Sequence, residues 1–119
     1  MIKLLALDLD GTTLNSSGQI PDANREAIVA AEAAGVLVTI ATGRRFRDAQ
    51  PVGRELGLNA PLITHNGALV KYADTEETVA CSLLTTEMSL EIVEIVADRH
   101  YVLRFKSLDR RQPCRPVTF

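Results

Sequence analysis

Three short apolar segments, separated by stretches with helical character, limit the possible folds more than any other feature of the chain. They are residues 2–9, 36–41 and 61–64. The first is almost continuously apolar, which is typical of a strand buried on both faces of a parallel sheet. Helices are predicted from residues 21–34 and from a more polar stretch that ends near residue 57. This alternation predicts right-handed βαβ units in an α/β, doubly wound, Rossmann-like sheet.

The pattern changes after Gly67. Residues 68–72 and 78–83 flank the polar stretch 73–77, and this arrangement predicts a hairpin. A helix is expected from Thr85 or Thr86 to about residue 99, and residues 101–105 can form one more strand.

The end of the chain is basic, whereas the part before it is acidic. Residues 107–116 have neither helical nor strand periodicity, so we expect an irregular tail. A nucleic-acid-binding arm is one interpretation. We favour a truncated or out-of-frame end, because nothing earlier in the chain complements a basic arm.

Charge and hydropathy narrow the classes of partner. A formal net charge of −2 argues against nucleic acid as a partner and favours a small molecule. Acidic residues interrupt the apolar start too early for a secretory signal, and no segment is long enough to span a membrane, so we expect no membrane partner and a cytoplasmic location. Cys81 and Cys114 are far apart in the sequence, and we expect both to be free thiols.

Two acids follow the first apolar segment. Asp8 and Asp10 are two residues apart, so on a strand both side chains point the same way, toward the carboxyl edge where open α/β sheets bind ligands. Two carboxylates so close repel each other, and a divalent cation relieves that repulsion. Mg²⁺ prefers such oxygen ligands and leaves room for a substrate phosphate. The alternative is a pair of solvated acids at a turn next to Gly11.

Three motifs together resemble a known family. Residues 8–14 (Asp-Leu-Asp-Gly-Thr-Thr-Leu) resemble the first signature of the haloacid dehalogenase (HAD) superfamily. Residues 41–44 (Ala-Thr-Gly-Arg) and 65–68 (His-Asn-Gly-Ala) resemble its Cof-type, sugar-phosphatase-like branch. The resemblance implies that residues 1–83 are the amino-terminal half of a HAD core. It also implies that residues 84–119 begin an inserted α+β cap with an irregular tail.

The resemblance also implies a mechanism for the first signature. Asp8 would attack phosphorus and become an aspartyl phosphate, which divides one difficult displacement into two steps. Asp10 would protonate the leaving oxygen and then take a proton from the attacking water. Mg²⁺ would be held by the Asp8 carboxylate and the Asp10 backbone carbonyl, so both residues are candidate metal ligands.

The other two motifs supply candidate substrate-binding residues. The hydroxyl of Thr42 can donate to a phosphoryl oxygen, although it can equally cap the next helix. Gly43 allows close approach of the backbone, and the planar fork of Arg44 matches a phosphate. Asn66 and Gly67 alone indicate a turn, and their position after the third strand adds them as candidate substrate contacts.

The resemblance calls for two further groups: a lysine that neutralises the aspartyl phosphate and a second set of acids. Neither Lys71 nor Lys106 lies in a suitable context, and Asp98 and Asp109 are isolated. The chain alone is therefore expected to be inactive as a phosphatase. The resemblance also places the neighbour of the first strand in a later segment, so that strand would have an unpaired edge through which copies of the chain can associate.

The sequence predicts a magnesium-dependent hydrolase of phosphate monoesters, with small phosphorylated metabolites such as sugar phosphates as substrates. A non-catalytic remnant is the main alternative. A phospho-acceptor receiver domain is a weaker one, because the strand that ends at Thr64 leads to His65 and Asn66 and not to an acceptor aspartate.

Overall fold

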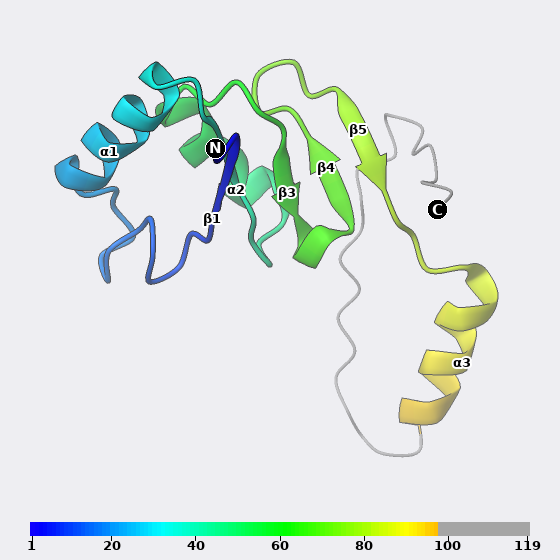
Figure 1. The fold of residues 1–119 in the computed structure, drawn as a ribbon. Coiled ribbons are helices and arrows are strands. Elements are labelled where there is room, and N and C mark those ends of the chain that lie inside the picture. The colour runs from blue at the N-terminus through cyan, green and yellow to red at the C-terminus, as the bar shows by residue number, and fades with distance from the viewer. Residues whose placement is uncertain (98–119) are drawn as a thin grey trace.

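The computed structural model describes residues 1–97 of the chain, and residues 98–119 lie outside the described part. In chain order the described elements are β1 (Leu4–Leu7), α1 (Asp22–Ala33), β2 (Leu37–Ile40), α2 (Phe46–Glu55), β3 (Leu62–Thr64), the 3₁₀ turn η1 (His65–Gly67), β4 (Leu69–Lys71), β5 (Thr78–Cys81) and α3 (Thr86–Ala97). Figure 1 shows the strands side by side, with α1 and α2 beside them and α3 apart from them.

The first three strands are parallel, as the sequence predicted. β1 pairs with β2 in register from Leu4 opposite Leu37 to Leu7 opposite Ile40. A parallel bridge between Ala41 and Ile63 joins the end of β2 to β3. The fold is therefore α/β with parallel strands and connecting helices. The carboxyl ends of β1, β2 and β3 lie at one edge.

The core lies beneath that edge. Leu9, Ile40 and Leu62 are fully buried, and α2 packs closely on β3. A Cβ atom added at Gly53 of α2 would lie 2.9 Å from Leu62 Cδ1, so the missing side chain is what lets the helix approach the strand. This packing holds α2 directly against β3.

The expectation that the first strand is buried on both faces is wrong for the described structure. The side chains of Leu4 and Leu5, which point to opposite faces, are 55 % and 37 % exposed. Among residues 1–97, β1 has β2 as its one paired neighbour. A hydrophobic run identifies a strand, but it does not say whether other elements cover the strand's faces and outer edge.

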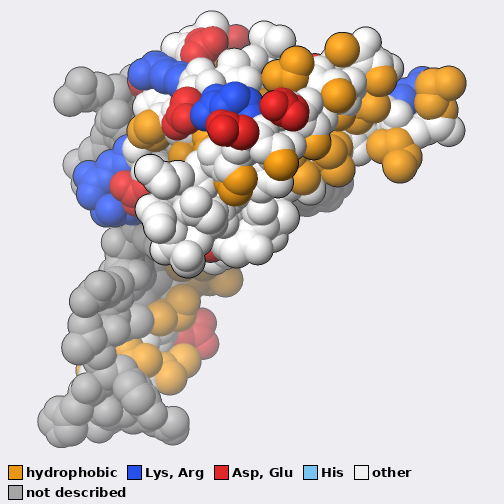
Figure 2. All heavy atoms as spheres, turned by 90° about the vertical axis from the view of Figure 1, so that its left-hand side faces the viewer, with side chains coloured by type: hydrophobic (Ala, Val, Ile, Leu, Met, Phe, Trp, Pro, Cys, Tyr) orange, Lys and Arg blue, Asp and Glu red, His pale blue; other side chains and the backbone are white. Residues whose placement is uncertain are grey.

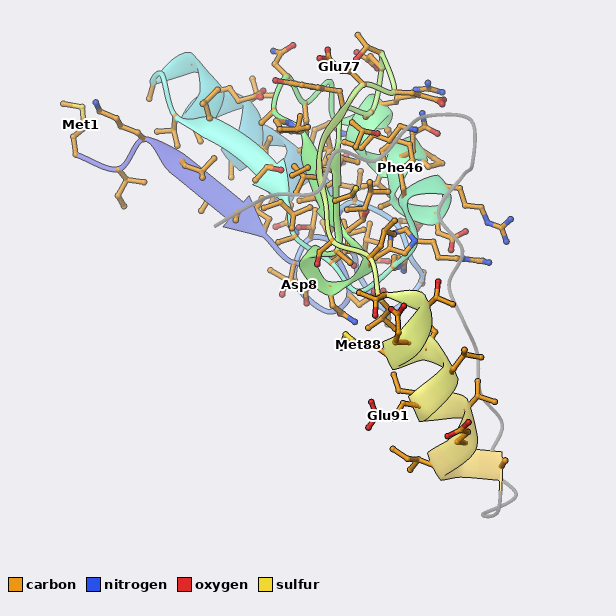
Figure 3. The ribbon with its side chains drawn as sticks, turned by 90° about the vertical axis from the view of Figure 1, so that its right-hand side faces the viewer. Met1, Asp8, Phe46, Glu77, Met88 and Glu91 are labelled. Carbon is orange, nitrogen blue, oxygen red and sulfur yellow. The ribbon has the colours of Figure 1, made fainter. Side chains whose placement is uncertain are left out.

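The predicted hairpin and the helix after it are confirmed. β4 pairs antiparallel with β3 on one side and with β5 on the other. Thr85 caps α3, because its Oγ1 accepts a hydrogen bond of 3.2 Å from the Met88 amide. In Figure 3 α3, marked by Met88 and Glu91, leads away from the strands at the end where Asp8 lies.

Some sequence predictions fall on residues outside the described part, namely the strand at residues 101–105, the basic tail and Cys114. Cys81 is buried and disulfide-bonded, so the prediction of a free thiol there is wrong. Within residues 1–97 no helix is both long enough and apolar enough to cross a membrane.

Candidate active site

The loop after β1 holds Asp8 at the carboxyl edge of the sheet. The Asp8 backbone carbonyl accepts hydrogen bonds from the Thr13 hydroxyl, at 2.7 Å, and from the Thr13 amide, at 3.2 Å. Asn24 of α1 donates from Nδ2 to the carbonyls of Thr12 and Thr13. One carboxylate oxygen of Asp8, Oδ1, accepts a hydrogen bond from the Leu9 amide at 2.8 Å. The loop backbone is therefore well fixed while the Asp8 side chain stays exposed.

The segment after β2 passes directly in front of β3. The Thr42 amide donates to the Ile63 carbonyl at 2.9 Å, and the Thr42 Oγ1 atom accepts a hydrogen bond of 3.2 Å from the Arg44 amide. A hydroxyl can accept and donate at the same time, so Thr42 retains an O–H that can donate to a ligand. The capping role and the binding role considered for Thr42 are thus compatible.

The turn after β3 has an unusual backbone. His65 and Asn66 have φ angles of 55° and 56°, in the left-handed region that residues other than glycine rarely adopt. Two hydrogen bonds hold the turn against the neighbouring loop: the His65 amide donates to the Arg44 carbonyl at 2.9 Å, and the Asn66 amide donates to the Thr42 carbonyl at 3.2 Å. Strained backbone of this kind is often found at functional sites.

The Asn66 side chain lies over Gly43. A Cβ atom added at Gly43 would be 2.6 Å from Asn66 Oδ1, closer than real Cβ contacts occur. Glycine at this position therefore leaves the space that the Asn66 carboxamide occupies, which is a packing reason for the Thr-Gly-Arg motif.

These segments surround one open pocket of about 430 Å³. Its lining brings together five of the seven residues selected from the sequence. The residues that line it are Asp8, Ala41, Thr42, Gly43, Ile63, Asn66 and Gly67. Sequence reasoning missed Ala41 and Ile63. The signal that could have found them is position: Ala41 opens the Ala-Thr-Gly-Arg motif, and Ile63 lies in the third apolar segment, two residues before the His-Asn-Gly-Ala motif.

Asp10 and Arg44 are not among the lining residues and instead bind each other beside the pocket. Arg44 Nε donates to Asp10 Oδ2 at 3.0 Å, and Arg44 Nη2 donates to Asp10 Oδ1 at 2.5 Å. This hydrogen-bonded guanidinium lowers the pKa of Asp10 below its ordinary value. The ion pair therefore favours the charged form of the Asp10 carboxyl in the free protein.

The residues present fit the start of a magnesium site. The Asp8 carboxylate is a hard oxygen ligand exposed at the pocket. In the part of the chain that the structure describes, however, no three or more His, Cys, Asp or Glu side chains gather into a group that could hold a metal ion.

Parallel strands that place an acid, a hydroxyl and an amide side chain around one pocket at their carboxyl edge define a doubly wound α/β protein with a ligand site at the usual position. The family model for haloacid dehalogenase-like hydrolases matches residues 5–111. The chain belongs to this family.

Relatives and solved structures agree with that assignment. The chain is 48 % identical over 67 residues to the 5-amino-6-(5-phospho-D-ribitylamino)uracil phosphatase YcsE of Bacillus subtilis, which covers 56 % of this chain and 27 % of the relative. It is 35 % identical over 101 residues to the HMP-PP phosphatase of Serratia proteamaculans, covering 85 % of this chain and 35 % of the relative. A haloacid dehalogenase-like hydrolase from B. subtilis superposes with a TM-score of 0.72 at 29 % identity, covering 84 % of this chain and 35 % of that chain.

The chain thus spans about a quarter to a third of the length of these curated relatives. The family match over residues 5–111 includes every residue that lines the pocket.

Proposed function

We propose that this chain supplies the nucleophile-bearing part of a magnesium-dependent phosphatase that hydrolyses phosphate monoesters of small metabolites, sugar phosphates among them. The observation that carries the proposal is the pocket that joins the Asp8 carboxylate to the Thr42 hydroxyl and the Asn66 turn. Membership of the family supports the reaction class, and the names of two relatives support small phosphorylated substrates. A cytoplasmic location stays a prediction from the sequence.

In the proposed reaction an oxygen of the Asp8 carboxylate attacks phosphorus. The bond between phosphorus and the ester oxygen breaks, and the leaving oxygen takes a proton from Asp10. The product on the protein is an aspartyl phosphate. Water then attacks this phosphorus while Asp10 accepts its proton, and the bond to Asp8 breaks to release phosphate and restore the carboxylate.

The remaining pocket residues are proposed to hold the phosphoryl group. The Thr42 hydroxyl donates a hydrogen bond to a phosphoryl oxygen, and Gly43 leaves its backbone open to close approach. Asn66 and Gly67 contact the substrate from the turn after β3. Arg44 directly follows Thr42 and Gly43, which line the pocket, so its long side chain can extend to the phosphoryl group.

Magnesium would be held by the Asp8 carboxylate and the Asp10 backbone carbonyl. When bound it would lower the repulsion between the attacking carboxylate and the phosphoryl oxygens. Further ligands would be needed to complete its coordination.

We also propose that the 119 residues alone hydrolyse phosphate esters only at background rate. Support comes from the family resemblance, which calls for a lysine and a second acidic set that the sequence does not present in a suitable context. A non-catalytic role is the second candidate function, and it is favoured by the ion pair that holds Asp10 outside the pocket.

The test uses a chimera, because the chain covers only part of its relatives. In the chimera, the segment of the B. subtilis phosphatase YcsE that aligns with this chain is replaced by the matching residues of this chain. The assay measures release of p-nitrophenol from p-nitrophenyl phosphate. The chimera should turn over, and Asp8→Asn should abolish turnover because an amide cannot form the acyl phosphate. Asp10→Asn should lower the rate by roughly 10²–10⁴-fold. Thermal melts confirm folding. Turnover unchanged by Asp8→Asn rejects the nucleophile.

A further inference from the structure

The ion pair between Arg44 and Asp10 occupies the Nε–Nη2 pair of guanidinium donors, one of the two forks that a phosphate could use. Both carboxylate oxygens of Asp10 are bound, one by Arg44 Nε and the other by Nη2. A phosphoryl group presents a similar pair of oxygens to the same planar fork of donors. The Arg44 side chain therefore cannot give this fork to a phosphate while it holds Asp10.

The backbone of Arg44 is fixed, so movement is restricted to its side chain. The Arg44 amide donates to Thr42 Oγ1, and its carbonyl accepts from the His65 amide. Both partners belong to the two loops that form the pocket. The guanidinium can thus swing between Asp10 and the pocket without rearranging the loops.

The pair lies in solvent, which makes this exchange easy. The side chains of Arg44 and Asp10 are 35 % and 60 % exposed. Exposed ion pairs contribute little net stability, because water and salt screen them. A phosphate held at the same time by Thr42 and the pocket backbone can therefore take Arg44 from Asp10.

We propose that Arg44 exchanges partners, holding Asp10 in the free protein and the phosphoryl group in the complex, so that phosphate binding releases Asp10 toward the pocket. The inference rests on the proposed function and adds a step to it. Asp10 then acts as a built-in competitor for the phosphate site. Its release on binding explains how a carboxylate held outside the pocket reaches a substrate.

The test measures binding of inorganic phosphate to the full chain by isothermal calorimetry at low salt. Asp10→Asn removes the competitor and should tighten phosphate binding by roughly three- to tenfold, since apparent affinity rises with the fraction of free Arg44. Asp48→Asn is the matched control. It removes another negative charge that acts on Arg44 but is not bound to its guanidinium, and it should change the affinity much less.

A double-mutant cycle separates exchange from simple charge removal. In an Arg44→Gln background, Asp10→Asn should give no gain in phosphate affinity, because the shared partner is absent. Equal gains from Asp10→Asn and Asp48→Asn, a gain that persists without Arg44, or absence of phosphate binding in Asp10→Asn would each overturn the proposal.

A second measurement needs no variant. In the wild-type chain, adding phosphate should shift the NMR signals of the Arg44 Nε–Hε group and the Asp10 carboxyl carbon together, with one saturation curve. Phosphate binding that moves neither signal overturns the exchange. Both experiments are equilibrium measurements, so they are independent of the turnover on which the proposed function is tested.

Discussion

Asn66 and Gly43 form a contact that ties two motifs of the pocket together. The carboxamide of Asn66 occupies the space where a Gly43 side chain would be, and hydrogen bonds between the two loops keep their backbones in place. The pocket shape at this point thus depends on the absence of one carbon atom.

Gly43→Ala should displace the Asn66 side chain while leaving the fold intact. The added methyl group would meet the end of a flexible side chain that can move aside, so the free energy of unfolding should fall by only about 1 kcal/mol, the low end for overpacking. Side-chain amide signals of Asn66 in NMR spectra and a thermal melt measure the two effects. In an Asn66→Ala background no carboxamide occupies this space, so Gly43→Ala should leave the NMR signals of the other pocket residues unshifted. An unchanged Asn66 signal in Gly43→Ala would contradict the packing argument.

The Arg44–Asp10 pair predicts a pH dependence. Arg44 lowers the folded-state pKa of Asp10 below its unfolded value of about 3.9. The pair's contribution to stability is therefore present above that unfolded pKa and is lost as pH falls through the folded pKa.

Arg44→Gln should raise the pKa of Asp10 back toward its ordinary value. The Asp10 carboxyl carbon, followed by NMR from neutral to acid pH, gives the midpoint directly. Asp48 is an internal control in the same spectrum, because its lowered pKa depends chiefly on Arg45 and only weakly on Arg44. The same Asp10 midpoint in both proteins would mean that the ion pair does not form in solution.

At the scale of the elements, the chain's periodicity predicts the order of strands and helices because each described element carries its own local signals. Pro21 and Gly35 bound α1, and each parallel strand lies within one of the three apolar segments. The exposure of β1 could not be predicted, because burial depends on what other segments cover the strand. The same limit applies to Cys81, whose bonding is a tertiary property.

The residues of the candidate site could be predicted to a similar extent. Residues that follow parallel strands meet at one edge by topology alone, and this rule brought Asp8, Thr42 and Asn66 together. The hydrogen-bond partner of a long side chain cannot be predicted in this way. Arg44 has several rotamers, and only the tertiary structure shows that it binds Asp10 rather than facing the pocket.

Burial in the described elements predicts a contrast between two leucines. Leu62 on β3 is 0 % exposed, whereas Leu90 on α3 is 59 % exposed. Leu62→Ala should cost about 2–5 kcal/mol in free energy of unfolding through lost packing. Leu90→Ala should change it by no more than about 0.5 kcal/mol. Urea unfolding followed by circular dichroism measures both. Equal costs would show that α3 packs against the rest of the protein in solution.

At the scale of the whole molecule, the described structure leaves hydrophobic surface uncovered. Figure 2 shows hydrophobic side chains gathered on one side of the molecule. The exposed large ones around the first strand pair are Ile2, Leu4, Leu5 and Leu37. β1 also has an edge that pairs with no strand in residues 1–97. An apolar strand edge of this kind is a template for pairing with another chain.

We therefore expect the chain to associate with itself through β1. Light scattering after size-exclusion chromatography should give a mass above 13.0 kDa that rises with concentration. Leu4→Lys places a charge on the exposed edge strand and should shift the mass toward the monomer. Val79→Lys, at an exposed position of β5, is the control and should leave association unchanged. A monomer at all concentrations, or equal effects of both variants, would contradict pairing through β1.

Covalent trapping can show whether Asp8 accepts the phosphoryl group. The chimera described above is mixed with p-nitrophenyl phosphate, quenched in acid during turnover and reduced with borohydride, which converts an aspartyl phosphate to homoserine. Peptide mass spectrometry then locates the modified residue. Modification is expected at Asp8 in the wild-type chimera, and none is expected at that position in Asp8→Asn. Modification at another residue, or turnover with Asp8 left unmodified, would contradict this expectation.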